Sequence, residues 1–295
     1  MNAYNLIVNN TVFFYSVIVI LGLIIGSFLN VVIHRLPVIL KSQWSKDCKL
    51  FLAENGNLKL PADTSPEIRY NLIVPRSTCP KCGHQIKAWE NIPVISYLLL
   101  RGKCSNCSAP ISIRYPIVEI LSAAVALVVA WQFGPGWQAA TAIILSWSLL
   151  CLSYIDYDHQ YLPDNITLPF LWLGLLVNLN GMFVDIASAV IGSMAGYLIL
   201  WVIYKTFKAA TGKEGMGYGD FKLLAMAGAW LGWQMLPVII LMSSVVGALF
   251  GTAMVLFKQH EKSKPIPFGP YLAIATWIAL LWGDHINNAY LKWIY

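Results

Sequence analysis

Residues 12–33 read VFFYSVIVILGLIIGSFLNVVI, a stretch without a single charged side chain. At about 1.5 Å of rise per residue, a helix of this length crosses the roughly 30 Å hydrocarbon core of a bilayer. The whole chain agrees, because 58% of its 295 residues are hydrophobic and only 12% are charged, whereas soluble domains carry about 25% charged residues. The mean hydropathy is +0.63. This composition excludes an ordinary soluble enzyme and predicts a membrane protein.

Seven further apolar segments follow the first one along the chain. The eight predicted spans cover residues 12–33, 117–133, 137–155, 166–179, 184–207, 221–231, 236–257 and 271–282. Gly-containing turns mark short connections on one side of the membrane, and the other side carries longer polar connections. The predicted fold class is therefore an all-α polytopic membrane protein of about eight transmembrane helices.

The distribution of basic residues predicts the orientation of these spans. With the N-terminus outside, 19 of the 20 Lys and Arg residues fall in the inside segments 34–116, 205–222 and 258–267, and only Lys292 falls outside. Cytoplasmic connections of membrane proteins carry such an excess of basic residues. The net charge of +6 is thus explained by orientation, and we expect no nucleic-acid partner. We also expect no cleavable signal peptide, because the first 11 residues lack a basic region.

The one sizeable predicted soluble segment, residues 36–115, contains two Cys-x-x-Cys pairs. Two such pairs present four thiolates to one tetrahedral zinc ion, which would make this segment a small zinc-ribbon-like domain with a structural metal. The alternative is two disulfides or four ordinary thiols, which a reducing cytoplasm disfavours. Residues 41–70 show no clear period, and we expect a loop or a hairpin there. The predicted zinc ligands are Cys79, Cys82, Cys104 and Cys107.

Two aspartates stand at the predicted inner ends of two spans. Asp156 follows the third span, and Asp220 precedes the sixth in the motif Gly217-Tyr218-Gly219-Asp220. Ionisable residues beside membrane spans are costly and mark functional sites. Two carboxylates at one membrane level suit aspartyl proteolysis, in which one accepts a proton from water and its protonated partner polarises the scissile carbonyl. Gly217 and Gly219 would let an extended substrate backbone approach closely.

Simpler interpretations exist for each acidic residue taken alone. Asp164 is explained by a helix cap or first-turn acid, and Asp158 by a solvated loop charge. An ion-coupled transporter is the main alternative function, since acids and glycine-broken helices also line ion paths. Acids at the membrane edge and the lack of a visible inverted repeat argue against it. A non-catalytic assembly factor would leave the Gly-x-Gly-Asp motif unexplained.

Motifs along the entire chain resemble the type IV prepilin peptidases, the bifunctional leader peptidases and N-methyltransferases of pilus and type II secretion systems. These proteins are intramembrane aspartyl proteases of the Gly-x-Gly-Asp type. The motifs are GSFLNVVIHRLP at 26–37, CPKCGH at 79–84, NIP at 91–93, RGKC at 101–104, RYP at 114–116 with Glu119, ID at 155–156 leading to LPD at 162–164, GYGDFK at 217–222 and FGP at 268–270.

The resemblance implies an activity, a cofactor and partners. It places the catalytic aspartates at Asp156 and Asp220, and a zinc site at the four paired cysteines. It implies cleavage of prepilin and pseudopilin precursors on the cytoplasmic side of the inner membrane, after a glycine that ends a basic leader. Methylation of the new N-terminal residue, usually Phe, with S-adenosylmethionine would follow. It further implies a first helix at 1–35, a cysteine domain linked to methylation at 36–115 and a peptidase domain at 116–295.

Overall fold

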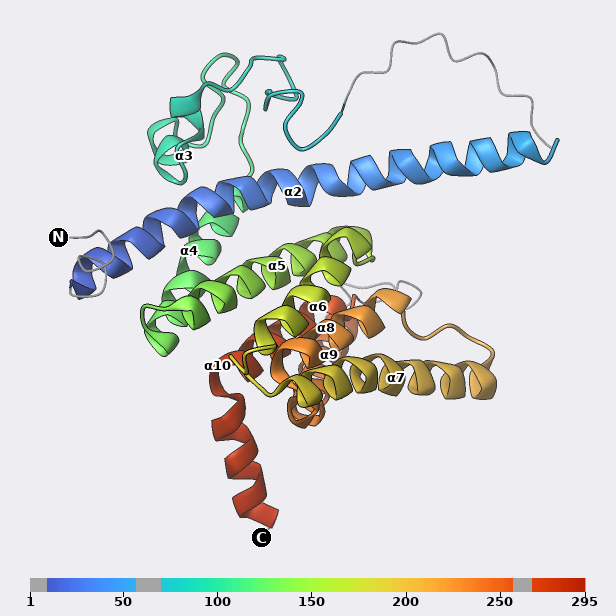
Figure 1. The fold of residues 1–295 in the computed structure, drawn as a ribbon. Coiled ribbons are helices and arrows are strands. Elements are labelled where there is room, and N and C mark those ends of the chain that lie inside the picture. The colour runs from blue at the N-terminus through green and yellow to red at the C-terminus, as the bar shows by residue number, and fades with distance from the viewer. Residues whose placement is uncertain (1–9, 57–69, 257–266, 295) are drawn as a thin grey trace. The chain divides into compact units, whose positions relative to one another are not determined.

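The computed structural model describes residues 10–56, 70–256 and 267–294 (Figure 1). Within these ranges all regular elements are helices, and extended pairing is limited to two isolated bridges. The all-α prediction is therefore confirmed for the described part of the chain. The elements are α2 (Thr11–Glu54), η1 (Ala88–Asn91), α3 (Ile95–Leu99), α4 (Arg114–Phe133), α5 (Trp137–His159), α6 (Asp164–Asn178), α7 (Ile186–Thr211), α8 (Tyr218–Leu231), η2 (Trp233–Met235), α9 (Leu236–Leu256) and α10 (Gly269–Ile294).

Each of the eight predicted spans lies within one helix, apart from one or two terminal residues, and α2 and α10 continue well beyond their predicted spans. Five helical stretches in the described ranges are both long and apolar enough to cross a membrane, which makes the chain a multi-pass membrane protein. Helices α6 and α8, with 15 and 14 residues, are shorter than the roughly 20 residues of a typical span. The five stretches are Thr11–Glu54, Arg114–Phe133, Trp137–His159, Ile186–Thr211 and Trp233–Ala253.

Helix α2 is much longer than the predicted first span. It continues through Pro37 to Glu54, so the expected loop or hairpin is wrong for residues 41–54. This stretch contains no Gly or Pro that would stop a helix. The helix ends just before Gly56, whose φ of 72° suits a glycine. Residues 57–69 and 257–266, with the basic residues counted there for the orientation, lie outside the described ranges.

The chain divides into two compact units, of which the first comprises Tyr15–Ala124. In this unit α2 packs on α4 through two glycines that are four residues apart. A Cβ atom added at Gly22 would lie 2.6 Å from Ala123 Cα, and one at Gly26 would lie 2.6 Å from Glu119 Cα. Small residues at this spacing let two helices in a membrane approach closely. The glycine pair thus fixes the contact from which the cysteine segment departs.

The second unit, Met1–Phe14 with Val125–Tyr295, is built around α8. Every residue from Leu223 to Leu231 is buried, and α8 packs against α6, α7 and α10. The contact with α7 is made backbone to backbone, since a Cβ at Gly192 would lie 2.5 Å from the Gly228 carbonyl oxygen. A Cβ at Gly196 would likewise lie 2.6 Å from the Leu224 oxygen. Helix α8 is therefore the closely packed centre of this unit.

The C-terminal end of α8 is tied to α6 by polar side chains. Trp230 Nε1 donates a hydrogen bond of 2.8 Å to the Phe170 carbonyl, and Asn178 Nδ2 donates to the carbonyls of Ala229 and Trp230 at 2.9 and 3.0 Å. The two bonds from Asn178 satisfy carbonyls in the last turn of α8, where no partner exists within the helix. With this end fixed, the opposite end of α8, which carries Asp220, is held at a defined depth in the unit.

Candidate active site and metal centre

Asp156 lies in the last turns of α5 and is only 5% exposed. Its Oδ2 accepts a hydrogen bond of 3.0 Å from the backbone N–H of Gly269, the first residue of α10. The first N–H groups of a helix have no partner within the helix and bind anions well. The start of α10, 113 residues further along the chain, therefore orients the Asp156 carboxylate.

Asp220 lies in the first turn of α8 and is 8% exposed. Asp156 interacts electrostatically with Asp220, so the two carboxyl groups are close in space. They are 64 residues apart in the chain and come from different helices. The structure thus brings together the two acids that the sequence singled out, both nearly shielded from solvent.

The two glycines before Asp220 have different structural roles. A Cβ added at Gly219 would lie 2.9 Å from Leu162 Cβ, so Gly219 lets the connection after α5 approach the start of α8. A Cβ at Gly217 would have only Asp220 Oδ2 and Gly219 N nearby, at 3.9 and 4.0 Å. Open space therefore remains beside Gly217 and next to the Asp220 carboxylate, as the expected close approach of a substrate backbone requires. Gly219 instead closes the distance between the two helix ends.

The neighbouring acids have structural partners. Asp164 lies in the first turn of α6, as predicted, and its two carboxylate oxygens each lie 2.7 Å from Lys222 Nζ. This ion pair links the start of α6 to the first turns of α8. Asp158 was expected in a loop, but it lies in the last turn of α5, where the helix continues to His159 before Gln160 adopts a left-handed conformation. The expectation of a loop at Asp158 was wrong, because α5 extends about one turn beyond the predicted end of the third span at residue 155.

Gly269 is a site residue that reasoning from the sequence missed. The triplet Phe268-Gly269-Pro270 was noted only as part of the resemblance. A Cβ at Gly269 would lie 2.6 Å from Asp156 Oδ2, so any side chain there would displace the carboxylate. The one available signal was a glycine beside a proline at a helix start, which fits many helix N-termini. Only the contact between distant segments gives it a role at the site.

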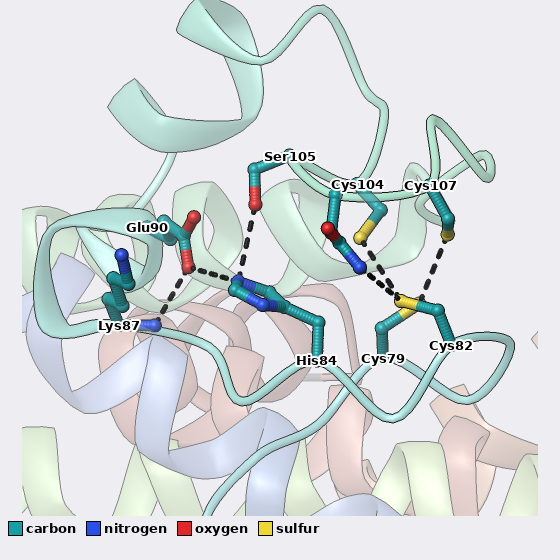
Figure 2. A network of polar contacts seen from close by, with 9 residues as sticks. Cys79, Cys82, His84, Lys87, Glu90, Cys104, Ser105 and Cys107 are labelled. Atoms are coloured by element: carbon teal, nitrogen blue, oxygen red, sulfur yellow. Dashed lines mark hydrogen bonds and ion pairs between the residues drawn. The ribbon is translucent and has the colours of Figure 1, made fainter.

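The two Cys-x-x-Cys pairs form a single cluster in the first unit. The four Sγ atoms lie within 4.8 Å of one another, with Cys79–Cys107 at 3.8 Å and Cys82–Cys104 at 4.0 Å (Figure 2). Sulfur atoms bound tetrahedrally to zinc at about 2.3 Å are roughly 3.8 Å apart. The cluster could therefore hold a metal ion. All six cysteines lie in the described ranges and are free, which contradicts the disulfide alternative.

Each pair is folded as a tight knuckle with the same backbone pattern. The N–H of Cys79 donates to the His84 carbonyl at 2.9 Å, and the N–H of Cys104 donates to the Ala109 carbonyl at 2.8 Å. Hydrogen bonds from backbone N–H groups to sulfur, led by the N–H of Cys82 for Cys79 and that of His84 for Cys82, lower the pKa of both thiols. For these two cysteines the lowered pKa values favour the thiolate form, which is the form that metals bind.

A polar network joins the two knuckles beside the sulfur cluster. His84 Nε2 lies 3.2 Å from Glu90 Oε2 and 3.4 Å from Ser105 Oγ, which belongs to the second knuckle (Figure 2). Glu90 Oε2 also accepts a hydrogen bond of 2.8 Å from the Lys87 N–H. This bond, followed by those from Ser105 and His84, lowers the pKa of Glu90 to about 2. His84 and Glu90 thus join the two knuckles of the cysteine segment.

Comparisons with known proteins agree with this architecture. Residues 20–133 match the model of the bacterial peptidase A24 N-terminal domain, and residues 143–252 match that of the type IV leader peptidase family. Among curated relatives, a prepilin leader peptidase/N-methyltransferase of Aeromonas salmonicida is 55% identical over 95% of both chains. Relatives of the same name are 53% identical in Stutzerimonas stutzeri, over 99% of both chains, and 47% identical in Neisseria gonorrhoeae, over 93% of both. No solved structure matches. At such identity and coverage, the chain belongs to the type IV leader peptidase family.

Proposed function

We propose that this chain cleaves the leader peptide of type IV prepilins and pseudopilins with Asp156 and Asp220 as its catalytic pair. The observation that carries the proposal is the electrostatic interaction between two buried carboxyl groups at the ends of α5 and α8, beside the open space at Gly217. The names of the relatives supply the substrate class. Buried, mutually interacting carboxyl groups are typical of aspartyl proteases.

In this mechanism one carboxylate accepts a proton from a water molecule, whose oxygen attacks the scissile carbonyl carbon. The protonated partner donates its proton to the carbonyl oxygen, which yields a neutral tetrahedral diol. Breakage of the C–N bond then releases the mature N-terminal amine, which takes a proton from one member of the pair. The other member accepts a proton from a hydroxyl of the diol, so that the leader ends in a carboxyl group and the pair returns to one shared proton. The hydrogen bond from the Gly269 N–H keeps the Asp156 carboxylate in place through these steps.

The second proposed activity is N-methylation of the new N-terminal residue, usually Phe. S-adenosylmethionine supplies the methyl group in that reaction. The cysteine segment 36–115 is proposed to support methylation, with residues 116–295 as the peptidase domain and 1–35 as the first transmembrane helix. The proposed metal is a structural Zn²⁺ held by the four clustered sulfurs, since four thiolates complete a tetrahedral site.

The proposed location is the bacterial inner membrane, with the N-terminus outside and the aspartates on the cytoplasmic side. The excess of Lys and Arg in the predicted inside segments supports this orientation. Fusions test it directly. Alkaline phosphatase, which needs export to become active, should be active when fused after residue 135 and inactive after residue 213. The reverse result would invert the orientation.

The central test uses purified protein in detergent and a synthetic prepilin with a Gly-Phe junction. Wild type should release the leader, as measured by mass spectrometry, and Asp220→Asn and Asp156→Asn should each abolish release. With added S-adenosylmethionine the mature product should gain about 14 Da, one CH₂ group. Intact substrate with a folded wild type would reject the peptidase and favour the transporter alternative.

A further inference from the structure

We propose that Tyr204 of α7 is a positioning residue, which holds the segment 212–219 so that Asp220 keeps its reactive position. The inference rests on the proposed peptidase activity, because it concerns the same aspartate. Nothing in the motifs that carry the family resemblance includes Tyr204. Its role follows from contacts that its ring makes with α8 and that its hydroxyl makes with the segment before α8.

The segment between α7 and α8 has high backbone conformational freedom because it is rich in glycine. It contains Gly212, Gly215, Gly217 and Gly219 within eight residues, and Gly212 ends α7 with a φ of 70°. Glycine loses more backbone entropy on ordering than any other residue. A catalytic residue that directly follows such a segment therefore needs contacts from outside the segment to hold it in place.

The ring of Tyr204 supplies the first of these contacts. Tyr204 is 3% exposed, and its ring centroid lies 5.4 Å from that of Tyr218 and 5.7 Å from that of Phe221. Tyr218 and Phe221 flank Asp220 in the chain, and their own rings are 5.2 Å apart. Aromatic pairs at such distances attract one another in tilted geometries. Tyr204 thus packs on the residues on both sides of the aspartate.

The hydroxyl of Tyr204 supplies the second contact, with the glycine-rich segment itself. Tyr204 Oη donates to Glu214 Oε1 at 3.2 Å, and Lys208 Nζ donates to both, at 3.3 Å to the hydroxyl and 2.6 Å to the carboxylate. The hydrogen bond from Lys208 also lowers the pKa of Glu214, so this acid is charged at neutral pH. Tyr204, Lys208 and Glu214 form a closed triangle, which we call the α7 clamp.

The three side chains of the α7 clamp differ in their exposure to solvent, and their contributions differ accordingly. The side chains of Lys208 and Glu214 are 45% and 69% exposed, and an ion pair in that environment contributes little by itself. Tyr204 is the buried member, and it alone contacts both the segment and α8. Tyr204 is therefore the residue that links the clamp to Asp220, through its contacts with Tyr218 and Phe221. Phe207, whose ring edge would lie 2.8 Å from a Cβ at Gly215, closes the segment from the same helix.

The test compares two tyrosines of α7 in the full-length protein. Tyr204→Phe removes the hydroxyl and keeps the ring, and Tyr197→Phe is the matched control. Tyr197 also contacts the Phe221 ring, at 5.8 Å, but its hydroxyl makes no hydrogen bond to any described residue. We expect Tyr204→Phe to lower kcat for prepilin cleavage by about tenfold to a hundredfold, the size of effect that slight misplacement causes, with KM nearly unchanged. Tyr197→Phe should stay within about twofold of wild type.

Glu214→Gln provides a second variant at an exposed position, which leaves the buried ring in place. We expect Glu214→Gln to lower kcat by a smaller factor than Tyr204→Phe does. Lys208→Glu and Glu214→Lys should each lower kcat as single variants, and the double variant that carries both should recover part of that loss. Lys213→Gln, a neighbouring lysine without an ion pair among the described residues, should have no effect. Equal kcat values for Tyr204→Phe and Tyr197→Phe would overturn the proposal.

Hydrogen exchange separates this inference from the proposed activity. If wild type cleaves no prepilin, the peptidase proposal fails. The α7 clamp still predicts faster amide exchange over residues 212–219 in Tyr204→Phe than in Tyr197→Phe, with no change in α6. Unchanged exchange over this segment in a protein that cleaves prepilin would reject the clamp and leave the catalytic pair untouched.

Discussion

At the scale of single residues, the candidate site depends on an absent side chain as much as on its two carboxyl groups. The Gly269 N–H binds Asp156 only because no Cβ occupies the space between them. The requirement is steric, since Gly269 lies in the first turn of an ordinary helix and not in a turn with positive φ. A methyl group is thus enough to test it.

We predict that Gly269→Ala lowers the rate of prepilin cleavage by about a hundredfold, because the new methyl group displaces the Asp156 carboxylate. Gly136→Ala is the matched control, since a Cβ at that position meets nothing within 4 Å. Leader release followed by mass spectrometry measures both variants, and methylation of a synthetic peptide that already begins at the mature N-terminus checks folding. Full cleavage by Gly269→Ala would contradict the role given to this glycine.

A second prediction at this scale concerns Glu90 and pH. Its pKa falls from an ordinary 4.5 to about 2 in the folded protein, so the unfolded chain binds the proton more readily. The stability that Glu90 contributes is then fully present above about pH 4.5 and is lost as the pH falls toward 2. Glu90→Gln should abolish this contribution.

The measurement for Glu90 is the difference in Tm between wild type and Glu90→Gln in detergent. We expect wild type to be the more stable at pH 6 and the difference to shrink below about pH 4.5. Protonation of the four clustered thiols affects both proteins and cancels in this difference. A difference in Tm that stays constant down to pH 3 would show that Glu90 keeps no low pKa.

At the scale of elements, α8 positions the site because its surroundings leave it no room to move. Glycines on α7 and α8 bring the two backbones into contact, and Asn178 and Trp230 tie its far end to α6. A helix of only 14 residues gains little from its own hydrogen bonds, so most of its stability comes from these contacts. The depth of Asp220 is therefore set by packing.

We predict that Gly192→Ala destabilises the protein by about 1–3 kcal/mol through overpacking, because its Cβ would lie against the Gly228 carbonyl oxygen. This loss outweighs the gain of about 1 kcal/mol that alanine brings in helix propensity. Thermal unfolding in detergent measures the effect. Ala187→Val, at an exposed position on the same helix, should change stability by less than about 0.5 kcal/mol. An unchanged Tm for Gly192→Ala would mean that α7 can shift away from α8.

At the scale of the whole molecule, the two candidate centres belong to different compact units. The aspartates lie in the unit formed mainly by Val125–Tyr295, and the sulfur cluster lies in Tyr15–Ala124. The matched family models divide along similar lines, at residues 20–133 and 143–252. Loss of metal should therefore affect the two proposed activities unequally.

For the proposed zinc site, we predict about one zinc ion per chain in wild type and none or nearly none in Cys104→Ser, because three sulfur ligands leave the tetrahedral site incomplete. Methylation should fall at least tenfold, whereas leader cleavage should stay within about threefold of wild type. Elemental analysis and mass spectrometry of the product measure these changes. Cys48→Ser is the control, since this cysteine lies outside the cluster. Equal losses of both activities would show that the units depend on each other.

Patterns of neighbouring residues determined much of this protein from the sequence alone. Uninterrupted apolar stretches predicted eight helices, and all eight exist, because lipid permits no other partner for the backbone of such segments. The paired spacing of the cysteines predicted their cluster, since each knuckle is closed by bonds within six residues. The extension of α2 to Glu54 was missed, because helix formation in a polar stretch leaves no hydrophobic period.

Contacts between distant segments were decided only by the tertiary structure. The sequence marked Asp156 and Asp220 as a pair, but the reasons why they meet lie at Gly219 against Leu162 and at Gly269 against Asp156. The clamp at Tyr204 is equally invisible in the chain, where a tyrosine on an apolar helix resembles any other aromatic residue of a membrane span. The physical reason is the range of the interactions: hydropathy, charge and knuckle spacing are local properties that can be read along the chain, whereas steric exclusion and hydrogen bonding between helix ends exist only once the helices are packed.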